Sequence, residues 1–152
     1  MRIVVFEPGE PARIDNIEPD EKGSYLRKLQ ELVGGMIEPV SVLYGNQPML
    51  WVNDSGLVDE LPLNRAIIAN EDMEKRGCRS WMGTRAPVRK GDTYTILAGT
   101  IVACSYDRDS EGEEVMRDIT DEEIELICGS LCQVFPIPKY TLRIVDSQEA
   151  RD

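Results

Sequence analysis

Apolar residues recur at helical spacing in only two stretches of this 152-residue chain, which limits how much helix its fold can contain. In the first stretch the apolar positions fall at i, i+1, i+4, i+7 and i+8, and they are Tyr25, Leu26, Leu29, Leu32 and Val33. Gly34 and Gly35 follow and supply the left-handed conformation that ends many helices. We therefore expect a helix that Ser24 caps and that buries one face.

The second helical stretch begins with a capping box, in which Thr120 is followed three residues later by Glu123. Apolar residues then recur at helical spacing, and they are Ile124, Ile127, Cys128 and Leu131. The pattern predicts a second helix with one buried face. Because Cys128 belongs to the apolar series, we expect it in the core.

The remaining periodic stretches favour strands. They are short apolar runs or alternating segments, at residues 3–6, 36–44, 49–52, 93–104 and 140–145. Gly99 lies inside the longest stretch and is expected to form a bulge. These segments and the two helices predict an α+β fold: a single domain with a mostly antiparallel sheet and two packed helices.

The composition favours one soluble domain. Hydrophobic residues make up 41% of the chain and charged residues 30%, and a chain of this length buries roughly two-thirds of its unfolded surface. We predict a globular domain over residues 1–145 and a polar tail over 146–152. No apolar run approaches the ~20 residues that span a bilayer, and charge returns too early, at Glu7, for a signal peptide. We therefore expect a cytoplasmic protein with no membrane partner.

Four cysteines and no histidine restrict the metal and redox chemistry of the chain. The cysteines lack the dense spacing of a secreted disulfide scaffold, so reduced thiols are the simpler interpretation. Cys128 and Cys132 lie one helical turn apart and supply two of the four ligands of a tetrahedral zinc site. With no histidine to complete such a site, we expect neither a metal nor a cofactor.

Positive charge is concentrated in one segment of an otherwise acidic chain. The net charge is −11, yet residues 75–90, here called the basic segment, hold six cations and no carboxylate: Lys75, Arg76, Arg79, Arg85, Arg89 and Lys90. The other 136 residues therefore carry −17. A local cluster of cations attracts anions even on an acidic protein, because the field is focused locally.

Five short motifs follow one another between residues 29 and 123. They are LQELVGGMIE at 29–38, VNDSG at 52–56, LPLNRA at 61–66, AGT at 98–100 and ITDEE at 119–123. Their order resembles a family of small uncharacterised domains carried by bacteriophages and conjugative elements, over most of residues 1–132. The resemblance implies a phage or mobile-element setting but no known reaction. Many members have a shorter or differently composed connector where this chain has residues 70–92, so the basic segment looks like a local elaboration.

The first candidate site is formed by Asn53, Asn64 and Arg65, which we expect in a turn and a loop. The guanidinium of Arg65 presents a planar donor fork suited to carboxylate or phosphate, and the two amides can read a base edge or a ribose. The alternative is structural. Asparagine in a turn commonly bonds its own backbone, and Arg65 lies near Asp59 and Glu60, which are suitable ion-pair partners.

The second candidate site lies in the basic segment and consists of Arg76, Arg79, Trp81 and Arg85. Charge beside an aromatic ring is typical of proteins that hold a nucleotide or another ring-bearing anion, and we expect the Trp81 indole to be at least partly exposed. The alternative is a solvated loop that is neutralised by residues 107–125, which carry ten carboxylates and two arginines. The same complementarity allows a homodimer in which each segment pairs with its mate.

The functional hypotheses follow from these sites and from the absence of histidine, the commonest general base. Glu38 is the best single acid or base, but it stands in no nucleophile-base pattern, so an enzyme ranks last. First is a non-catalytic phage or mobile-element accessory protein in the host cytoplasm, active in counter-defence, that binds a small phosphorylated, nucleotide-like ligand. The alternative is an acidic inhibitor that mimics DNA phosphates and occupies a host protein. Direct nucleic-acid binding is not expected of so acidic a chain.

Overall fold

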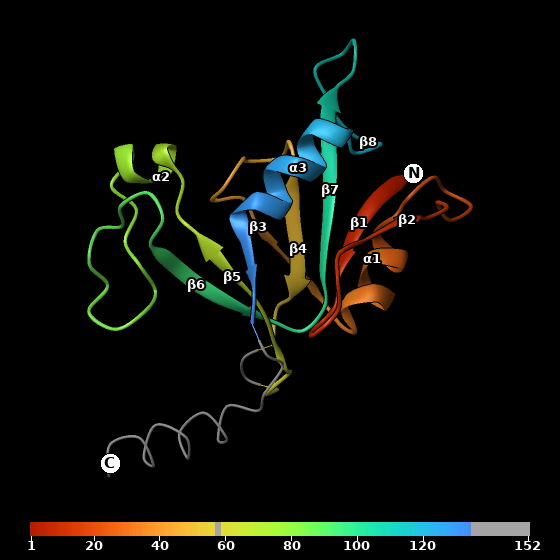
Figure 1. Ribbon diagram of the computed structural model, residues 1–152. Helices are drawn as coiled ribbons and strands as arrows, with labels where there is room; N and C mark the ends of the chain where they lie inside the picture. The colour runs from red at the N-terminus through yellow and green to blue at the C-terminus, as the bar shows by residue number, and fades with distance from the viewer. Residues whose placement is uncertain (57–58, 135–152) are drawn as a thin grey trace.

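The computed structural model describes residues 1–56 and 59–134, in which nine strands and three helices are present (Figure 1). In chain order these are β1 (Arg2–Phe6), β2 (Arg13–Asn16), α1 (Leu26–Val33), β3 (Ile37–Val40), β4 (Met49–Asn53), β5 (Leu63–Ile68), α2 (Glu71–Lys75), β6 (Thr93–Ala98), β7 (Ile101–Arg108), β8 (Glu114–Arg117), α3 (Asp121–Ser130) and β9 (Leu131–Gln133). Every strand pairing is antiparallel. The predicted α+β fold is confirmed.

The strands form two sheets. The larger has the order β2-β1-β7-β4-β3, with β8 paired to the far end of β7, and the smaller has the order β6-β5-β9. Strand β7 is central, because Ala103 lies opposite Val4 of β1 on one side and Leu50 of β4 on the other. Strands β3 and β6 are therefore edge strands of different sheets. Residues of both strands line one cavity.

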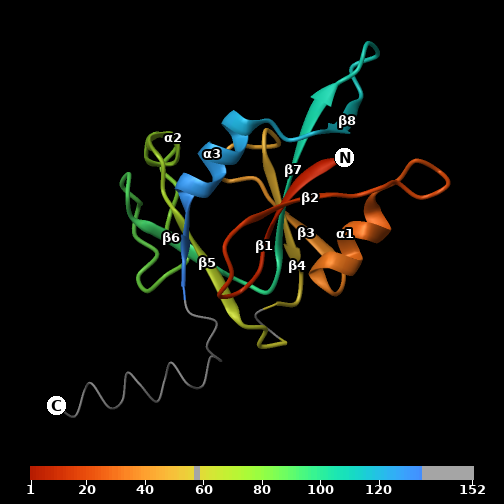
Figure 2. The same ribbon diagram turned by 45° about the vertical axis from the view of Figure 1, so that its right-hand side comes forward.

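Two apolar clusters cover opposite faces of the larger sheet. Ile3 and Val5 of β1 belong to the cluster beneath α1, whereas Val4 and Phe6 belong to the cluster that contains Ile127 of α3. This division follows from the alternation of side chains along a strand, and it explains why β1 is a continuous apolar run. Figure 2 shows α1 and α3 on opposite sides of the larger sheet.

Helix α1 ends as predicted and begins differently. Gly34 adopts the left-handed conformation at its end, with φ 79°. At its start, Tyr25 occupies the capping position and makes no side-chain cap bond. We expected Ser24 at this position, but Ser24 lies one residue before it. The Ser24 hydroxyl accepts a hydrogen bond from the Leu26 backbone N–H at 3.2 Å. The predicted Ser24 cap is therefore wrong by one position.

Helix α3 begins with the predicted capping box. The Glu123 backbone N–H donates to Thr120 Oγ1 at 3.1 Å, and the Thr120 N–H donates to Glu123 Oε1 at 3.0 Å. Ile127 is fully buried, but Cys128 is exposed, so its predicted core position is wrong. Neighbouring helical residues differ by about 100° in direction, and here Ile127 faces the core.

The long strand predicted over residues 93–104 is two strands in different sheets. Gly99 separates them with φ 77°, and its N–H donates to Pro62 O at 2.8 Å. A left-handed residue of this kind turns the chain out of the first sheet, so the expected bulge is a link between sheets. The strand predicted over 36–44 is also shorter, because the chain turns after Val40 and Gly45 N–H bonds Ser41 O.

Helix α2 and strands β2, β5, β8 and β9 had no counterpart in the predicted elements. Helix α2 has only five residues and one buried side chain, Met73, so it is too short to show helical periodicity. The predicted strand at 140–145 and the polar tail at 146–152 lie outside the described residues. None of the described helices has the length and apolar character needed to cross a membrane.

The carboxylate of Glu123 stabilises the start of α3 in a pH-dependent way. Burial alone would raise its pKa, but hydrogen bonds from Arg117, Ser105 and the Thr120 N–H outweigh burial and lower the pKa from 4.5 to about 2. The Ser105 Oγ bond is 2.7 Å long, and Arg117 donates through both terminal nitrogens at 2.8 and 3.0 Å.

Lowering the pH is therefore expected to destabilise the protein partly through Glu123. A pKa lowered by folding gives stability that is complete above pH 4.5 and is lost as the pH falls towards 2. The complete loss is on the order of 3 kcal/mol, of which about 2 kcal/mol is reached at pH 3. Urea unfolding of the wild type and of Glu123→Gln at pH 7, 4.5 and 3 measures it, because the variant lacks this titration. If the free energy of unfolding depends on pH in the same way in the two proteins, Glu123 does not contribute to the loss of stability in acid.

Candidate functional site

The first candidate site is part of the protein interior. Asn64 and Arg65, predicted in a loop, lie in strand β5, and both are buried. Asn64 is fully inaccessible, and its amide nitrogen donates to Phe6 O at 2.8 Å and to Gly99 O at 2.7 Å. It thereby ties β5 to the end of β1 and to the link between β6 and β7.

Arg65 is also committed to internal contacts. Its guanidinium donates to Asn64 Oδ1 at 2.7 Å and to Glu10 O at 2.6 Å, and lies 5.4 Å from the centre of the Phe6 ring. Burial lowers its pKa. Within residues 1–56 and 59–134 no carboxylate lies within ion-pair distance of it. Backbone carbonyls and an amide oxygen therefore take the place of Asp59 and Glu60, the ion-pair partners of the alternative hypothesis.

Asn53 holds the end of α1 against β4. Its amide nitrogen donates to Val33 O at 3.2 Å, and its oxygen accepts from the Ser55 N–H at 2.7 Å. The side chain is 8% exposed, so it resembles the structural turn asparagine of the alternative hypothesis. Asn64 and Arg65 use their polar groups internally and are not available to a ligand in this conformation. Asn53 bonds internally as well, but it lines the cavity described below.

The basic segment is folded. Val88 N–H donates to Cys78 O at 2.9 Å and Ser80 N–H to Ala86 O at 3.0 Å, which makes residues 78–88 a short hairpin. Met73 before it and Val88 within it are buried in the core cluster that contains Ile127. Buried residues on both sides of the hairpin tip, residues 81–85, therefore anchor it to the core.

The six cations of this segment fall into two groups. Lys75 pairs with Glu71 at 3.3 Å, and Arg76 pairs with Asp72 at 2.6 Å and donates to Val42 O. Arg76 is thus used within the protein, and we remove it from the candidate site. In the part of the chain that the structure describes, the others make no ion pair: Arg79, Arg85, Arg89 and Lys90.

The acidic stretch at 107–125 does not neutralise the basic segment through any ion pair of the described residues. Its carboxylates pair with Arg2, Arg108 and Arg117. The basic segment's own ion pairs involve only carboxylates of α2. The homodimer that the two charged regions would allow stays a prediction.

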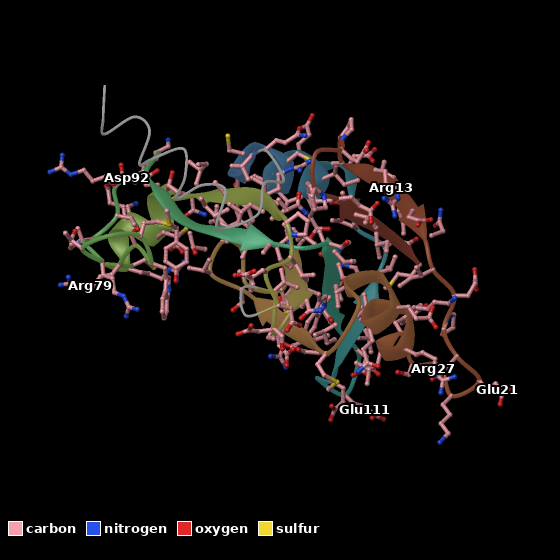
Figure 3. All side chains as sticks on the ribbon, turned by 90° about the horizontal axis from the view of Figure 1, so that it is seen from below. Arg13, Glu21, Arg27, Arg79, Asp92 and Glu111 are labelled. Atoms are coloured by element: carbon pink, nitrogen blue, oxygen red, sulfur yellow. The ribbon has the colours of Figure 1, made fainter. Side chains whose placement is uncertain are left out.

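Trp81 forms an exposed aromatic surface at the hairpin tip. The side chain is 60% exposed, as predicted, and its Nε1–H donates to Tyr94 Oη at 2.8 Å. The guanidinium carbon of Arg85 lies 4.6 Å from the centre of a Trp81 ring, within cation–π range. Arg79 donates to Arg85 O at 3.4 Å and lies at an exposed end of the molecule (Figure 3). The indole is therefore fixed in orientation and has positive charge beside it.

Arg85 is held in a backbone conformation that is unfavourable for a side chain of its size. Its φ is 55°, in the left-handed region. Such a residue costs of order 1–3 kcal/mol and persists where the surrounding structure requires it. The guanidinium of this residue is the one that lies over the indole.

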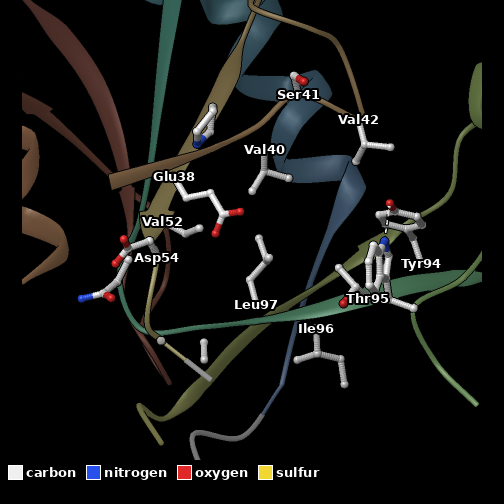
Figure 4. A pocket seen from close by; sticks show the side chains of 15 residues that line it. Glu38, Val40, Ser41, Val42, Val52, Asp54, Tyr94, Thr95, Ile96 and Leu97 are labelled. Atoms are coloured by element: carbon white, nitrogen blue, oxygen red, sulfur yellow. Dashed lines mark hydrogen bonds between the residues drawn. The ribbon is translucent and has the colours of Figure 1, made fainter. Parts of the chain in front are cut away.

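A cavity of about 630 Å³ lies between the edge strands β3 and β6, beside the hairpin tip (Figure 4). Its walls are mostly apolar, from Val40, Val42, Val52, Ile96 and Leu97. Tyr94 lies at one end, with Trp81 hydrogen-bonded to it, and Glu38 and Asp54 lie at the other. The volume is within the usual range of small-molecule sites, about 300–1,000 Å³.

The charges of the cavity are separated from those of the hairpin. The only charged side chains among its lining residues are the carboxylates of Glu38 and Asp54. Arginine side chains lie outside it, at the Trp81 end. The arrangement suits a ligand with an apolar or donor-bearing ring in the cavity and an anionic group at the hairpin.

Several lining residues had not been predicted as site residues. Tyr94, Leu97 and Val42 belong to alternating segments, which predict strands but do not show which strands meet. Tyr94 lies in β6, and the hydrogen bond from Trp81 joins the hairpin tip to this strand. Among the described residues there is no group of three side chains able to hold a metal ion.

A family model described as a domain of unknown function, DUF3846, matches residues 1–131, so the chain belongs to this family. This agrees with the resemblance to an uncharacterised domain family. No curated protein and no solved structure matched the chain. Function must therefore be inferred from the site.

Proposed function

We propose that this member of a family without an assigned activity is a binding domain for a small phosphorylated ligand of the nucleotide type. The observation that carries the proposal is the exposed Trp81 ring with the Arg85 guanidinium 4.6 Å from its centre, at one end of the cavity of about 630 Å³. The ring of the ligand packs in the cavity against the indole, and its phosphate lies outside, near Arg85 and Arg79.

This placement agrees with the interaction energies expected for the base and for the phosphate of the ligand. A base stacked on an aromatic side chain contributes about 1–3 kcal/mol. Arginine matches the geometry of phosphate, and Arg79 and Arg85 make no ion pair within the described residues that a phosphate would have to displace. The two carboxylates at the far end of the cavity would repel a phosphate there. The ligand therefore has one preferred direction.

The biological setting of this proposal is that of a phage or mobile-element accessory protein that acts in the host cytoplasm. A protein that captures a nucleotide signal of host defence needs a binding site but no catalytic base. The Trp81 site provides recognition without a nucleophile-base pair, and Glu38 has no imidazole partner because the chain contains no histidine.

Thermal-shift measurements with nucleoside monophosphates and cyclic dinucleotides test the proposed ligand class. A ligand that binds only the native state stabilises it by about 2.7 kcal/mol at a concentration 100 times its Kd. We expect a concentration-dependent rise in Tm with at least one compound of the panel, and none with ribose or with inorganic phosphate at equal ionic strength. A panel without any shift would exclude the nucleotide proposal.

Replacing Trp81 by alanine is expected to weaken nucleotide binding about tenfold or more, because a stacking surface is lost. Trp81→Phe keeps a ring and is the matched control, with a smaller loss. Binding is followed by calorimetry, or by fluorescence in a Trp51→Phe background. Trp51 lies in β4 and bonds Tyr106 Oη at 3.2 Å, so it reports folding. Unchanged affinity in Trp81→Ala would place the ligand elsewhere.

The acidic inhibitor is the second candidate, and the β7–β8 hairpin favours it. This hairpin projects from the body of the molecule (Figure 1) and carries Asp107, Asp109, Glu111, Glu113 and Glu114. Val115 beside them is 42% exposed, which adds apolar contact area. A host protein bound in this way would be released by salt and would be insensitive to Trp81→Ala.

A further inference from the structure

Glu38 projects into the cavity from the edge strand β3 (Figure 4). It lies opposite Val52 in the β3–β4 ladder and two residues before Val40, and all three side chains line the cavity. Glu38 is exposed, and within residues 1–56 and 59–134 its carboxylate makes neither a hydrogen bond nor an ion pair. A carboxylate placed in this way keeps both oxygens available as acceptors.

Asp54 at the same end of the cavity is different. One of its oxygens already accepts a hydrogen bond from Ser55 Oγ at 3.1 Å. A ligand in the cavity can therefore donate hydrogen bonds to both carboxylate oxygens of Glu38. Asp54 adds negative charge near it.

We propose that Glu38 makes this site selective for guanine. This inference rests on the nucleotide site proposed above. Guanine has two adjacent donors in the plane of its ring, N1–H and the N2 amino group, which match the two oxygens of one carboxylate. In adenine and cytosine a donor stands next to a ring-nitrogen acceptor, and in uracil the single N–H is flanked by two carbonyls. These bases offer a carboxylate at most one hydrogen bond and place an acceptor against its other oxygen.

The rest of the site agrees with a guanosine phosphate. In this pose the ring lies between the Glu38 carboxylate, which its edge contacts, and the Trp81 indole, on which it packs, with the apolar residues of β3 and β6 beside it; Arg79 and Arg85 lie at the Trp81 end, near the phosphate. The Glu38 carboxylate repels phosphate from its end of the cavity. Glu38 therefore recognises the base, whereas Arg79 and Arg85 recognise the phosphate.

Calorimetric titration of the full chain with GMP, IMP and AMP tests the inference. IMP is the matched ligand, because it differs from GMP only by lacking the N2 amino group. We expect GMP to bind about tenfold or more tightly than either, as for other bidentate base contacts. Equal affinity for the three nucleotides would overturn guanine selectivity and leave the proposed nucleotide site intact. Absence of binding by all three, and by the wider panel above, would overturn both.

Glu38→Gln is the decisive variant. Glutamine presents one acceptor and one donor, which match N6–H and N1 of adenine, so the variant should lose affinity for GMP and gain affinity for AMP. Asp54→Asn is the control, since it removes the same charge at the same end of the cavity and should leave the ratio of GMP to AMP affinity unchanged. Equal effects of the two variants on that ratio would show that charge alone acts, and would overturn a direct contact with Glu38.

Discussion

Replacing Arg79 and Arg85 together by glutamate is expected to abolish nucleotide binding and to leave the fold intact. Both side chains are exposed and make no ion pair within the described residues. Surface charges of this kind contribute typically under about 1 kcal/mol each to stability. At an anion site, however, reversal of two charges replaces attraction by repulsion and removes the cation–π contact with Trp81.

The matched control for this variant is Lys22→Glu with Arg27→Glu. It changes the net charge by the same amount, and both positions are exposed; Figure 3 shows Arg27 and Arg79 at opposite ends of the molecule. Circular dichroism reports the fold and calorimetry reports binding. If both double variants bind equally weakly, the effect comes from overall charge, and if both bind as the wild type does, the hairpin tip is a solvated loop.

The parts of the fold that could be predicted are those whose signals are local. The capping box of Thr120 and Glu123 and the left-handed Gly34 are determined by a few neighbouring residues, and the apolar run of β1 is buried on both faces. The split at Gly99 was missed for the opposite reason. Whether a glycine inside an alternating segment bends a strand or starts another sheet depends on the partners of each half.

Strand β5 was missed because its sequence contradicts its environment. Pro62, Asn64 and Arg65 are residue types that favour turns or solvent, so the motif predicts a loop. In the structure, carbonyls from β1, from the residues after β1 and from the sheet link satisfy the Asn64 and Arg65 donors. These partners come from distant parts of the chain, and no local pattern reveals them.

In the candidate site, too, one part could be predicted from neighbouring residues and another part could not. The exposure of Trp81 could be predicted because it stands in a segment rich in cations and glycine, between Arg79 and Arg85, which favours solvent. The cavity could not be predicted. It exists because β3 and β6 are edges of separate sheets, and Glu38 meets Leu97 only after both sheets have formed.

Replacing Asn64 by leucine is expected to destabilise the protein by about 3 kcal/mol or more. The two side chains branch at the same carbon and have the same number of heavy atoms, but leucine leaves the buried carbonyls of Phe6 and Gly99 without this donor and removes the oxygen that accepts from Arg65 Nη1. Each buried polar group left unpaired costs about 1–3 kcal/mol, and more when it is charged. Since domains of this size have only about 5–15 kcal/mol of stability, the loss is a large fraction of the total.

Urea unfolding followed by circular dichroism measures this loss, with Asn16→Leu as the control. Asn16 lies in the same kind of element, strand β2, but is exposed, so its replacement should change stability by under about 0.5 kcal/mol. A folded Asn64→Leu protein that still binds its nucleotide, with a lowered urea midpoint, is the expected result, because Asn64 acts on the fold and not on the ligand. Wild-type stability combined with lost binding would return Asn64 and Arg65 to the ligand site and would contradict their assignment to the core.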